Sequence, residues 1–476
     1  MSFSFNSEVH PQKMFTVSFS ELESRLEPEY YTPDLRNLEN IVRKQSDHKL
    51  RHYIRGISSG ATPSTTQPKK YYTDKENGYP FLRVQNLQIN GKLNFNNLKY
   101  INEKTHNGKL QRSQVEEGDL LIKITGVGRM AIASVAPEGF VGNTNQHMVV
   151  VKTESRGISE YLANYLNLDL VETLASRRAT GATRPALDYQ ALKSIPIIEG
   201  LDFGIIEEAY QTKAQKEAEA KELLNSIDDY LLSELGIEVP EKDNSLENRI
   251  FTTSFQSLSG MRCDPNYHSK YLLFKSINPK YSFVKLREAL EISPQYGANE
   301  TAIDGNPNTD TRYLRITDID DNGNLKNDSW QTAEKIEEKY LLENNDILFA
   351  RSGSVGRCFL YKKKYGRAIF AGYLIRFKLN EKILLPEYLF YYANSSFFEY
   401  WVSMIKRPTT QANINSEEFM NLPIPTPTIK KQKEIVDTIS RMRNKAKQLK
   451  EEAERAVEEA RRQVEEMILE EDSVSA

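Results

Sequence analysis

The chain of 476 residues repeats itself, and this internal duplication constrains its fold more than any other feature of the sequence. The segment Asp119–Ile122 followed by Gly126 returns as Asp346–Phe349 followed by Gly353, about 227 residues later. Further pairs match in the same order at offsets of about 227 to 237 residues: Arg25–Tyr30 with Arg262–Tyr267, Phe81–Val84 with Tyr313–Ile316, Tyr161–Leu162 with Tyr388–Leu389, and Leu192–Ile197 with Phe419–Ile424. A single order at a nearly constant offset indicates a tandem duplication, in which each copy is a globular block followed by a long helix.

Each block is predicted to be of the α+β class. Short apolar segments rich in β-formers, separated by Gly, Asn and Pro turns, are typical of strands. They lie at Pro80–Leu87, Leu120–Ile124, His147–Val151 and Phe370–Phe377. Length and periodicity predict one helix over Leu162–Leu174 and another over Tyr388–Trp401.

A long helix is predicted after each block. The first runs from Ile205 to Leu235 and ends at Gly236, with Pro240 beyond it as a stop signal. The second runs from Ile429 to about Glu470 and carries a seam with a heptad spacing, which predicts a coiled coil. The seam consists of Ile435, Met442, Leu449 and Ala456, with Ile439, Ala446, Ala453, Ala460 and Met467 four residues after each register. A solvated charged helix is the alternative, more so for the first helix, where Lys213 and Glu217 interrupt the apolar stripe.

These features divide the chain into four segments. The expected boundaries are 1–204 for the first block, 205–240 for the central helix, 241–425 for the second block and 426–476 for the C-terminal helix. The length is sufficient for two or three separate cores.

The formal net charge of −3 hides two cationic regions. Residues 51–100 carry 8 Lys and Arg against 2 Asp and Glu, and residues 351–410 carry 11 against 3. The acidity gathers at 201–250, with 5 basic against 13 acidic residues. A basic region in each block is what phosphate binding requires, although ordinary surface charge is an equally valid interpretation at this point.

Composition argues against several other classes of protein. No apolar run is long enough to span a membrane, and residues 1–10 lack the layout of a signal peptide, so a cytoplasmic location is expected. Cys263 and Cys358 stand outside any CxxC or Cys/His cluster, so we expect both to be reduced and partly buried. Six scattered histidines predict no metal site.

The sequence also lacks the motifs of a catalytic centre. It contains no phosphate-binding loop of the GxxxxGK[ST] type, no HExxH helix and no GxSxG elbow. The nearest approach to an adenine methyltransferase motif is Asp264–Tyr267, which lacks the second proline and belongs to the internal repeat. We therefore expect no catalytic residue in this chain.

Three segments together resemble a known family. They are Phe81–Leu87, the Glu117–Ile122 element with its glycine turn, and the exit Leu192–Pro196 into a helix, and the second block repeats all three. This ordered set, followed each time by a long helix, resembles the target recognition domains of type I restriction-modification specificity subunits. One departure is Asn345 before Asp346, where the first block has Gly118, although Asn also tolerates a left-handed conformation.

The resemblance implies a fold, a function and partners. Each block would read one half of a bipartite double-stranded DNA site, and the two helices would pack antiparallel as a spacer. Two methyltransferase subunits would dock on this chain, and a motor-nuclease restriction subunit would join them. S-adenosylmethionine, ATP and Mg would be held by those partners and not by this chain.

Candidate DNA-binding residues are polar side chains on glycine-containing loops. Arg, Lys, Asn and Gln pair bidentately with guanine or adenine, and glycine beside a cation lets backbone amides approach phosphate. Residues repeated in both blocks, such as Arg83 and Arg315, are expected to hold the common fold, whereas Arg184 against Gln411 differs and is a better candidate for base choice. The candidates are Ser58, Thr62, Arg83, Gln85, Asn86, Lys123, Thr125, Arg129, Arg177, Arg178, Thr183, Arg184, Arg315, Thr317, Arg351, Ser352, Ser354, Arg357, Lys406, Arg407, Thr409, Gln411 and Asn413.

Two other functions compete with this one. The chain could be the recognition subunit of a related system that serves a fused methyltransferase-nuclease. It could also be a coiled-coil scaffold that binds protein alone, which predicts no salt-dependent affinity for DNA.

Overall fold

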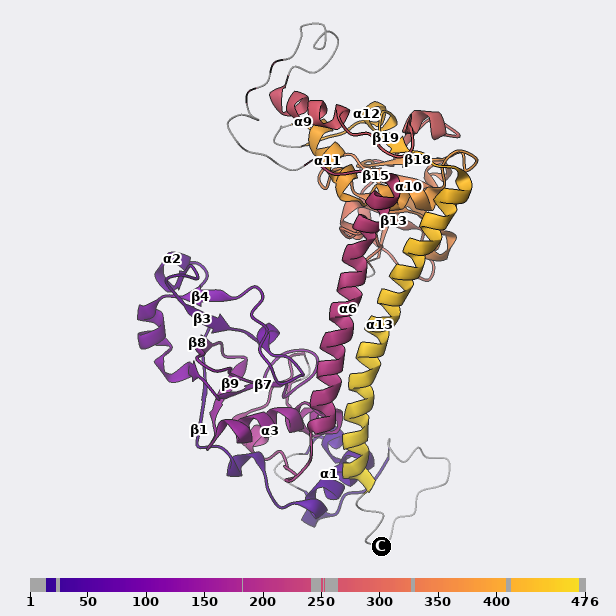
Figure 1. The fold of residues 1–476 in the computed structure, drawn as a ribbon. Helices are drawn as coiled ribbons and strands as arrows, with labels where there is room; N and C mark the ends of the chain where they lie inside the picture. Colours follow the sequence, from indigo (N-terminus) through magenta and orange to yellow (C-terminus); the bar gives the residue numbers. More distant parts are fainter. Residues whose placement is uncertain are drawn as a thin grey trace. The chain divides into compact units, whose positions relative to one another are not determined.

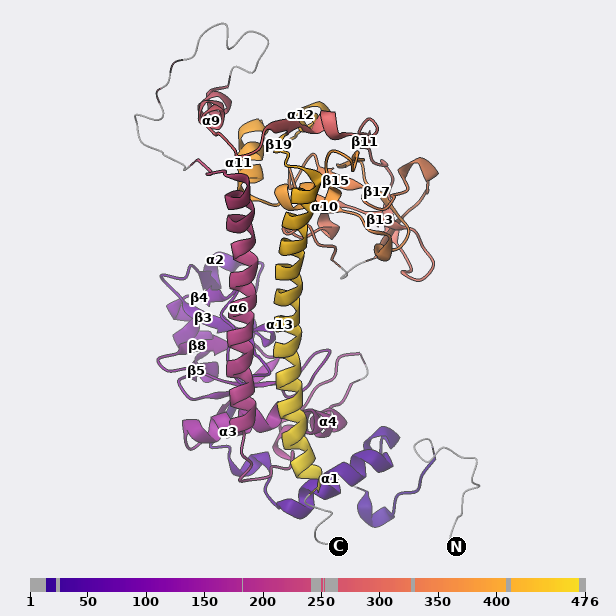
Figure 2. The same ribbon diagram turned by 45° about the vertical axis from the view of Figure 1, so that its right-hand side comes forward.

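The computed structural model describes residues 14–22, 26–181, 183–240, 250, 252, 264–326, 330–407 and 412–470. The chain divides into two compact units, unit 1 formed by Met1–Lys216 with Glu451–Ala476 and unit 2 formed by Glu217–Lys450. The repeated Arg25 and Arg262, as well as Cys263, lie outside the described residues. Both units have a mixed α+β fold (Figures 1 and 2), as predicted.

Unit 1 is built on two sheets (Figure 1). A four-stranded sheet has the order β1-β9-β6-β7, and a five-stranded sheet has the order β2-β4-β3-β8-β5. The strands are β1 (Gly56–Ser59), β2 (Tyr72–Thr73), β3 (Tyr79–Leu82), β4 (Lys99–Ile101), β5 (Gln114–Glu116), β6 (Leu120–Lys123), β7 (Ala133–Val135), β8 (Val141–Thr144) and β9 (Met148–Lys152). The helices are α1 (Pro33–Gln45), α2 (Pro68–Tyr71), α3 (Arg156–Leu166), α4 (Asp169–Arg178), α5 (Tyr189–Lys193) and the start of α6 (Gly204–Leu235).

Unit 2 repeats the central part of this topology. Its four-stranded sheet has the order β11-β18-β15-β16, and β10·β19, β12·β14 and β13·β17 form two-stranded pairs. The strands are β10 (Phe283–Lys285), β11 (Gln295–Tyr296), β12 (Ala302–Asp304), β13 (Arg312–Leu314), β14 (Gln331–Ala333), β15 (Ile347–Ala350), β16 (Cys358–Leu360), β17 (Ala368–Phe370), β18 (Leu374–Phe377) and β19 (Pro423–Pro425). The helices are α9 (Pro265–Lys275), α10 (Pro386–Tyr392), α11 (Ser396–Ile405), α12 (Ser416–Met420) and α13 (Ile429–Glu470), whose last turns belong to unit 1.

The strand pairing shows that the duplication extends to register. The central strand β6 pairs Leu120 with Val151 of β9, and β15 pairs Ile347 with Phe377 of β18. Each unit also has a parallel pair, β3 with β8 and β13 with β17. The strands around the central one therefore correspond in order and direction, as the repeated sequence predicts.

The central strand of each unit is buried on both faces. In β6, Leu120 and Ile122 pack into the larger core, whereas Leu121 packs into a second apolar cluster on the opposite face, because successive side chains alternate across a strand. The second unit repeats this with Ile347 and Leu348. Cys358 of β16 is fully buried, whereas the sequence predicted partial burial. This burial raises the pKa of its thiol.

Four sequence predictions of single elements were wrong in detail. The helix expected over Leu162–Leu174 is two helices, α3 and α4, and the one expected over Tyr388–Trp401 is α10 and α11. The Phe370–Phe377 segment contains the end of β17, which pairs with β13, and β18, which belongs to the four-stranded sheet. In the Pro80–Leu87 segment the strand ends at Leu82, and a 3-10 turn follows.

Side chains explain the helix breaks. Asn167, at the end of α3, turns toward β7, where it accepts from the Ala133 N–H at 3.1 Å and donates to its carbonyl at 2.8 Å. In unit 2 the Ser395 hydroxyl accepts from the Phe398 N–H at 3.2 Å and so caps α11. Polar residues that bond the backbone locally compete with a continuous helix, which periodicity alone cannot detect.

The two long helices α6 and α13 lie beside each other within each unit (Figure 2). In unit 1, Ile206 and Ala209 share a core with Val464 and Ile468, and Lys213 pairs with Glu454 at 2.7 Å. In unit 2, Ala220 packs with Ala446 and Leu449. In unit 1 the start of α6 meets the end of α13, and in unit 2 Glu234 near the end of α6 pairs with Lys431 near the start of α13 at 2.8 Å. The two helices therefore run antiparallel within each unit.

The seam of α13 departs from the predicted heptads after Ala453. Val457, Val464 and Ile468 are buried, whereas Met467 is 57% exposed. From Ala446 onward the buried positions follow 3, 4, 4 spacing, an eleven-residue repeat, and such a repeat removes the left-handed supercoil that strict heptads impose. The assignment of Met467 to the seam was therefore wrong, while Ala446, Ala453 and Ala460 are buried as expected.

One tight turn is conserved in conformation between the two units although its residue changes. Gly118 has φ +78° and Asn345 has φ +75°, both in the left-handed region. Asn345, a departure from the glycine of the first block, thus adopts the left-handed conformation that Asn tolerates. Because a Cβ at residue 118 would come no closer than 3.4 Å to Arg156, backbone strain decides what is tolerated there.

We expect Gly118→Ala to destabilise the full chain by about 1–2 kcal/mol, because alanine is strained in the left-handed region. Gly118→Asn should cost clearly less, since Asn occupies the equivalent turn of unit 2. Thermal or denaturant unfolding measures both, and Gly108→Ala, where a Cβ meets open space, is the matched control. An equal loss for Gly118→Ala and Gly118→Asn would contradict this explanation.

Candidate nucleic-acid interface

In unit 1 backbone hydrogen bonds bring together several loops that carry predicted residues, at one end of the central sheet. The glycine loop (residues 124–129) leaves β6 at Ile124, whose N–H donates to the His147 carbonyl at 3.0 Å. The Ile124 carbonyl accepts from the Leu187 N–H at 2.8 Å. These bonds bring together the loop before β9 and the segment after α4, which carries Arg184.

Several candidate side chains lie on the surface that results. Thr183 and Arg184 are exposed, and Thr125 forms a bridge with Ala186. Thr62 donates its backbone N–H and its hydroxyl to the Gln146 side-chain oxygen, at 2.8 and 2.7 Å. Burial lowers the pKa of His147, and the positive charge of Arg184 lowers it further. The imidazole ring is therefore neutral near pH 7.

Unit 2 forms the equivalent surface with the same backbone hydrogen bonds. The second glycine loop (residues 351–357) leaves β15 at Arg351, whose N–H donates to the Tyr373 carbonyl at 2.9 Å. Its carbonyl accepts from the Ile414 N–H at 2.9 Å. Arg351 therefore occupies the position of Ile124, and Tyr373 that of His147.

Two cavities flank the glycine loop of unit 2. The first, of about 460 Å³, is lined by Arg351, Ser352 and Asn413, all predicted residues. Its remaining lining was not predicted: Tyr296, Gly297, Asn299, Tyr340, Gly372 and Tyr373. None of these nine residues is acidic, which makes the first cavity compatible with an anionic or electron-rich ligand.

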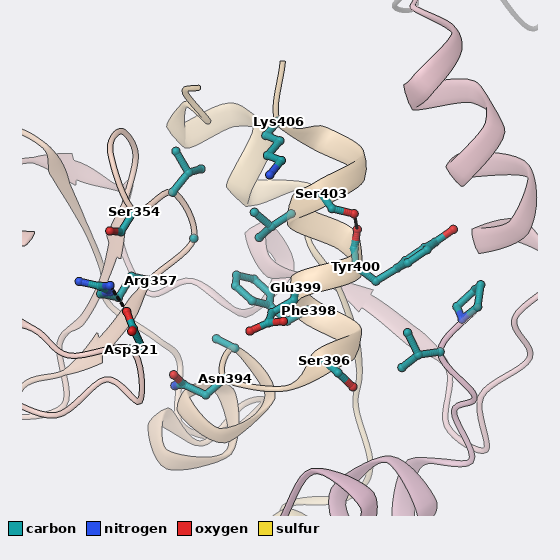
Figure 3. A pocket seen from close by; sticks show the side chains of 16 residues that line it. Asp321, Ser354, Arg357, Asn394, Ser396, Phe398, Glu399, Tyr400, Ser403 and Lys406 are labelled. Atoms are coloured by element: carbon teal, nitrogen blue, oxygen red, sulfur yellow. Dashed lines mark hydrogen bonds and ion pairs between the residues drawn. The ribbon is translucent and has the colours of Figure 1, made fainter. Parts of the chain in front are cut away.

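The second cavity, of about 620 Å³, lies between the glycine loop and α11 (Figure 3). Ser354, Arg357 and Lys406 line it, but Asp321 and Glu399 do so as well. Arg357 is ion-paired with Asp321, as Figure 3 shows, and is not available to a ligand without breaking that pair. The acidic groups make this second cavity a poorer place for a phosphate than the first.

Burial corrects part of the candidate set. Asn86 is 1% exposed, accepts from the Arg83 N–H at 2.8 Å and donates to the Asn94 carbonyl at 2.8 Å. Lys123 is buried, donates to the Val127 carbonyl at 2.9 Å, and burial lowers its pKa. Both side chains stabilise a turn of unit 1, so a direct contact with DNA does not fit their positions.

The arginines at the end of α4 also belong to the interior. Arg178 donates to Glu39 at 2.6 Å and to the Leu174 carbonyl at 2.8 Å, and Arg177 pairs with Glu39 and covers the Tyr30 ring at 4.1 Å. Their side chains are 3% and 5% exposed. They anchor α4 to α1 and do not face solvent.

Other repeated arginines bind within their own unit. Arg129 pairs with Asp169 and donates to the Leu168 carbonyl at 2.8 Å, and Arg357 donates to the Ile319 carbonyl at 2.8 Å. Arg83 donates to the Asn97 carbonyl at 2.9 Å. The expectation that repeated residues hold the common fold agrees with these contacts, and it extends to Arg315, which is bonded to Asp318.

The other candidates differ in exposure. Thr62, Gln85, Thr317, Ser354, Lys406 and Arg407 are exposed, Ser58 is half-buried in β1, and Ser352 is buried. Thr409 and Gln411 lie outside the described residues.

Sequence reasoning missed Tyr296, Asn299 and Tyr373, which line the first cavity of unit 2. Tyr296 and Tyr373 stand beside glycines, Gly297 and Gly372. A Cβ at Gly297 would lie 2.4 Å from the Ala371 carbonyl oxygen, and at Gly60 in unit 1 it would lie 1.7 Å from that of Thr144. Gly60 and Gly297 directly follow β1 and β11, two strands that the sequence analysis did not predict.

Comparison with known proteins finds one family model that matches part of the chain. Residues 279–459 match the type I restriction modification DNA specificity domain. The chain thus carries a DNA specificity domain in its second half. This match agrees with the resemblance to type I restriction-modification specificity subunits that the repeated motifs carry.

One solved structure agrees with this chain in fold, and two others are similar at lower TM-scores. A chain solved for complex assembly and conformational transition of the type I R-M system matches with a TM-score of 0.50 at 13% identity, covering 89% of this chain and 96% of that one. The HsdS subunit from Thermoanaerobacter tengcongensis has a TM-score of 0.38 at 13% identity, covering 89% and 95%. The type I S subunit from M. genitalium has a TM-score of 0.37 at 12% identity, covering 88% and 94%. No curated protein matches the chain by sequence.

The described residues offer neither a membrane span nor a metal site. None of their helices is long and apolar enough to cross a membrane. Within the same residues, no group of three or more His, Cys, Asp or Glu side chains could hold a metal ion.

Arg178 and Arg184 form a matched pair for testing the division between fold and surface in unit 1. Arg178→Ala breaks a buried ion pair, which costs about 3–5 kcal/mol and should lower the melting temperature by several degrees. Arg184→Ala removes an exposed side chain, which usually changes stability by no more than about 0.5 kcal/mol, and should instead weaken recognition of one DNA half-site. Melting curves combined with binding to duplex DNA test both statements. Equal damage to both half-sites by Arg184→Ala would show that Arg184 is structural.

Proposed function

We propose that the chain is the sequence-specific DNA-binding subunit of a type I restriction-modification complex, in which each unit reads one half of a bipartite site. The observation that carries the proposal is the same polar surface formed twice by equivalent backbone hydrogen bonds, with different side chains on it. Ile124 and His147 of unit 1 stand where unit 2 has Arg351 and Tyr373. A shared framework with divergent surface side chains is what two different half-sites require.

Electrostatics support the choice of DNA over a protein ligand. The cationic stretches 51–100 and 351–410 fall one in each unit, and the first cavity of unit 2 contains an arginine and no carboxylate. Phosphate contacts position a protein on DNA, and polar side chains on loops then read base edges. The protein-scaffold alternative leaves this arrangement without a purpose.

Chemistry belongs to partner subunits in this proposal. Two methyltransferase subunits supply S-adenosylmethionine, and a motor-nuclease subunit supplies ATP and Mg, so this chain directs their activity and catalyses nothing itself. We place the complex in the cytoplasm.

The long helices are proposed to be an antiparallel coiled-coil spacer between the two readers. Within each unit, buried positions of α6 and α13 face each other, and Lys213–Glu454 and Lys431–Glu234 pair across them at 2.7 and 2.8 Å. Helices of fixed length suit a ligand that repeats along an axis, as duplex DNA does.

Genome-wide mapping of methylated adenine tests the central assignment. In cells that hold the whole system, we expect one bipartite motif to be methylated, and to lose this modification when the chain is deleted. Deletion complemented by Arg184→Ala should change one half of the motif. Methylation that persists unchanged without the chain would contradict the proposal.

Paired heptad insertions test the spacer. Seven residues added to α6 at Ala220 and to α13 at Ala446 keep the facing positions matched, because these residues pack together. The added length is about 10 Å, so the unspecified gap of the DNA site should grow by up to about three base pairs, with both half-sites unchanged. Two residues added at each position instead rotate the seam by about 200° and should impair folding. An unchanged gap in an active heptad variant would show that the helices do not set the spacing.

A further inference from the structure

The guanidinium group of Arg351 differs in its hydrogen bonding from those of other arginines with a buried Nε. Within the described part of the chain, a buried Nε without a hydrogen-bond partner occurs in Arg83, Arg129, Arg351 and Arg376. Of these, Arg83, Arg129 and Arg376 use their terminal guanidinium nitrogens in internal bonds, for example from Arg376 to the Leu341 carbonyl at 2.8 Å. Among the described residues, the Arg351 guanidinium makes no hydrogen bond or ion pair.

An aromatic ring holds this unpaired guanidinium in place. The Arg351 guanidinium carbon lies 4.8 Å from the centre of the Tyr296 ring, within the range of a cation–π contact. The ring is fixed in turn, because the Tyr296 hydroxyl lies 3.1 Å from the Ser416 hydroxyl and accepts from the Ser416 N–H at 3.1 Å. Tyr296 itself belongs to β11, where it pairs with Ile375.

The backbone of Arg351 is fixed as well. Its N–H donates to the Tyr373 carbonyl, and its carbonyl accepts from the Ile414 N–H, both at 2.9 Å. The side chain therefore starts from a rigid point and is restrained by Tyr296, so little conformational entropy is lost when the terminal N–H groups bind a ligand. Arg351 lines the first cavity of unit 2, together with Asn299, Ser352 and Asn413.

The chemistry of this cavity selects its ligand. Unpaired guanidinium N–H groups fit two acceptors side by side, and guanine presents O6 and N7 in that arrangement at its major-groove edge. Adenine presents a donor in place of O6, which opposes the arginine. None of the nine described residues that line this cavity carries a carboxylate that could compete for the guanidinium, whereas Asp321 and Glu399 line the second cavity.

We propose that Arg351 reads a guanine in the half-site bound by unit 2, as the residue that determines this base. The inference rests on the proposed function and goes beyond it by assigning one base type to one side chain. Unit 1 has Ile124 at the equivalent backbone position and cannot make this contact, so the guanine requirement belongs to one half-site only.

The test uses the full chain with its methyltransferase partners and a pool of random duplex DNA. Sites selected by the wild type define the two half-sites, and the half that changes with Arg184→Ala belongs to unit 1. The variants are Arg351→Ile, which has the side chain of the equivalent position in unit 1, and Arg351→Gln, which keeps a polar side chain. The control is Arg367→Ile, an exposed arginine that does not line the cavity.

Arg351→Ile and Arg351→Gln should each lose the preference for one guanine in the unit 2 half-site, by roughly 5- to 150-fold, the worth of a bidentate contact. The unit 1 half-site should be unchanged. Replacing that guanine by 7-deazaguanine, which lacks N7, should weaken wild-type binding and have little effect on Arg351→Ile. The control Arg367→Ile should leave the base preferences at both half-sites unchanged.

Other outcomes overturn the inference and separate it from the proposed function. A unit 2 half-site without guanine, or a 7-deazaguanine effect equal in wild type and variant, refutes the role of Arg351 while leaving the specificity subunit intact. A uniform loss for all duplexes in both variants, with unchanged base preferences, assigns Arg351 to phosphate or to folding. If the wild type selects no sequence at all, the proposed function itself fails.

Discussion

The candidate surface of each unit depends on two backbone hydrogen bonds at the residue that leaves the central strand. In unit 1 that residue is Ile124, and in unit 2 it is Arg351. Each binds the loop before the neighbouring strand through its N–H and the returning segment through its carbonyl. Because the central strand is buried on both faces, this junction cannot shift, and three chain segments distant in sequence are held at one edge.

The duplication separates residues that maintain the fold from residues that distinguish the units. Repeated side chains such as Arg129 and Arg357 bond carbonyl groups of their own unit, and Asp119 and Asp346 both accept from backbone N–H groups in the tight turn before the central strand. Residues that differ, such as His147 against Tyr373, lie on the surface between the loops. Two readers with different targets can therefore share one framework without conflict.

Much of this organisation could be predicted from the sequence, because it rests on repetition and periodicity. The order of the repeats and the two long helices both follow from such patterns. The break between α3 and α4 could not be predicted in this way, since Asn167 ends the helix through a contact with β7, far away in sequence. Met467 was placed in the seam for a related reason, because a heptad pattern read from one helix does not reveal where the partner shifts the spacing.

The site was harder to predict than the fold. Charged residues at glycine loops were a fair guide to its location, but charge does not reveal burial, and Lys123 and Arg178 point into the interior. Tyr296, which restrains Arg351, comes from a strand more than fifty residues earlier in the chain. Only the tertiary pairing of β11 with β18 brings it there.

Hydroxyl-radical footprinting of the chain in its complex on a selected duplex tests the two-reader account most directly. The account predicts two protected patches separated by an accessible gap, with protection of one patch alone reduced when the surface of one unit is altered. A single continuous patch, or a footprint that responds as a whole to a change in either unit, would contradict it.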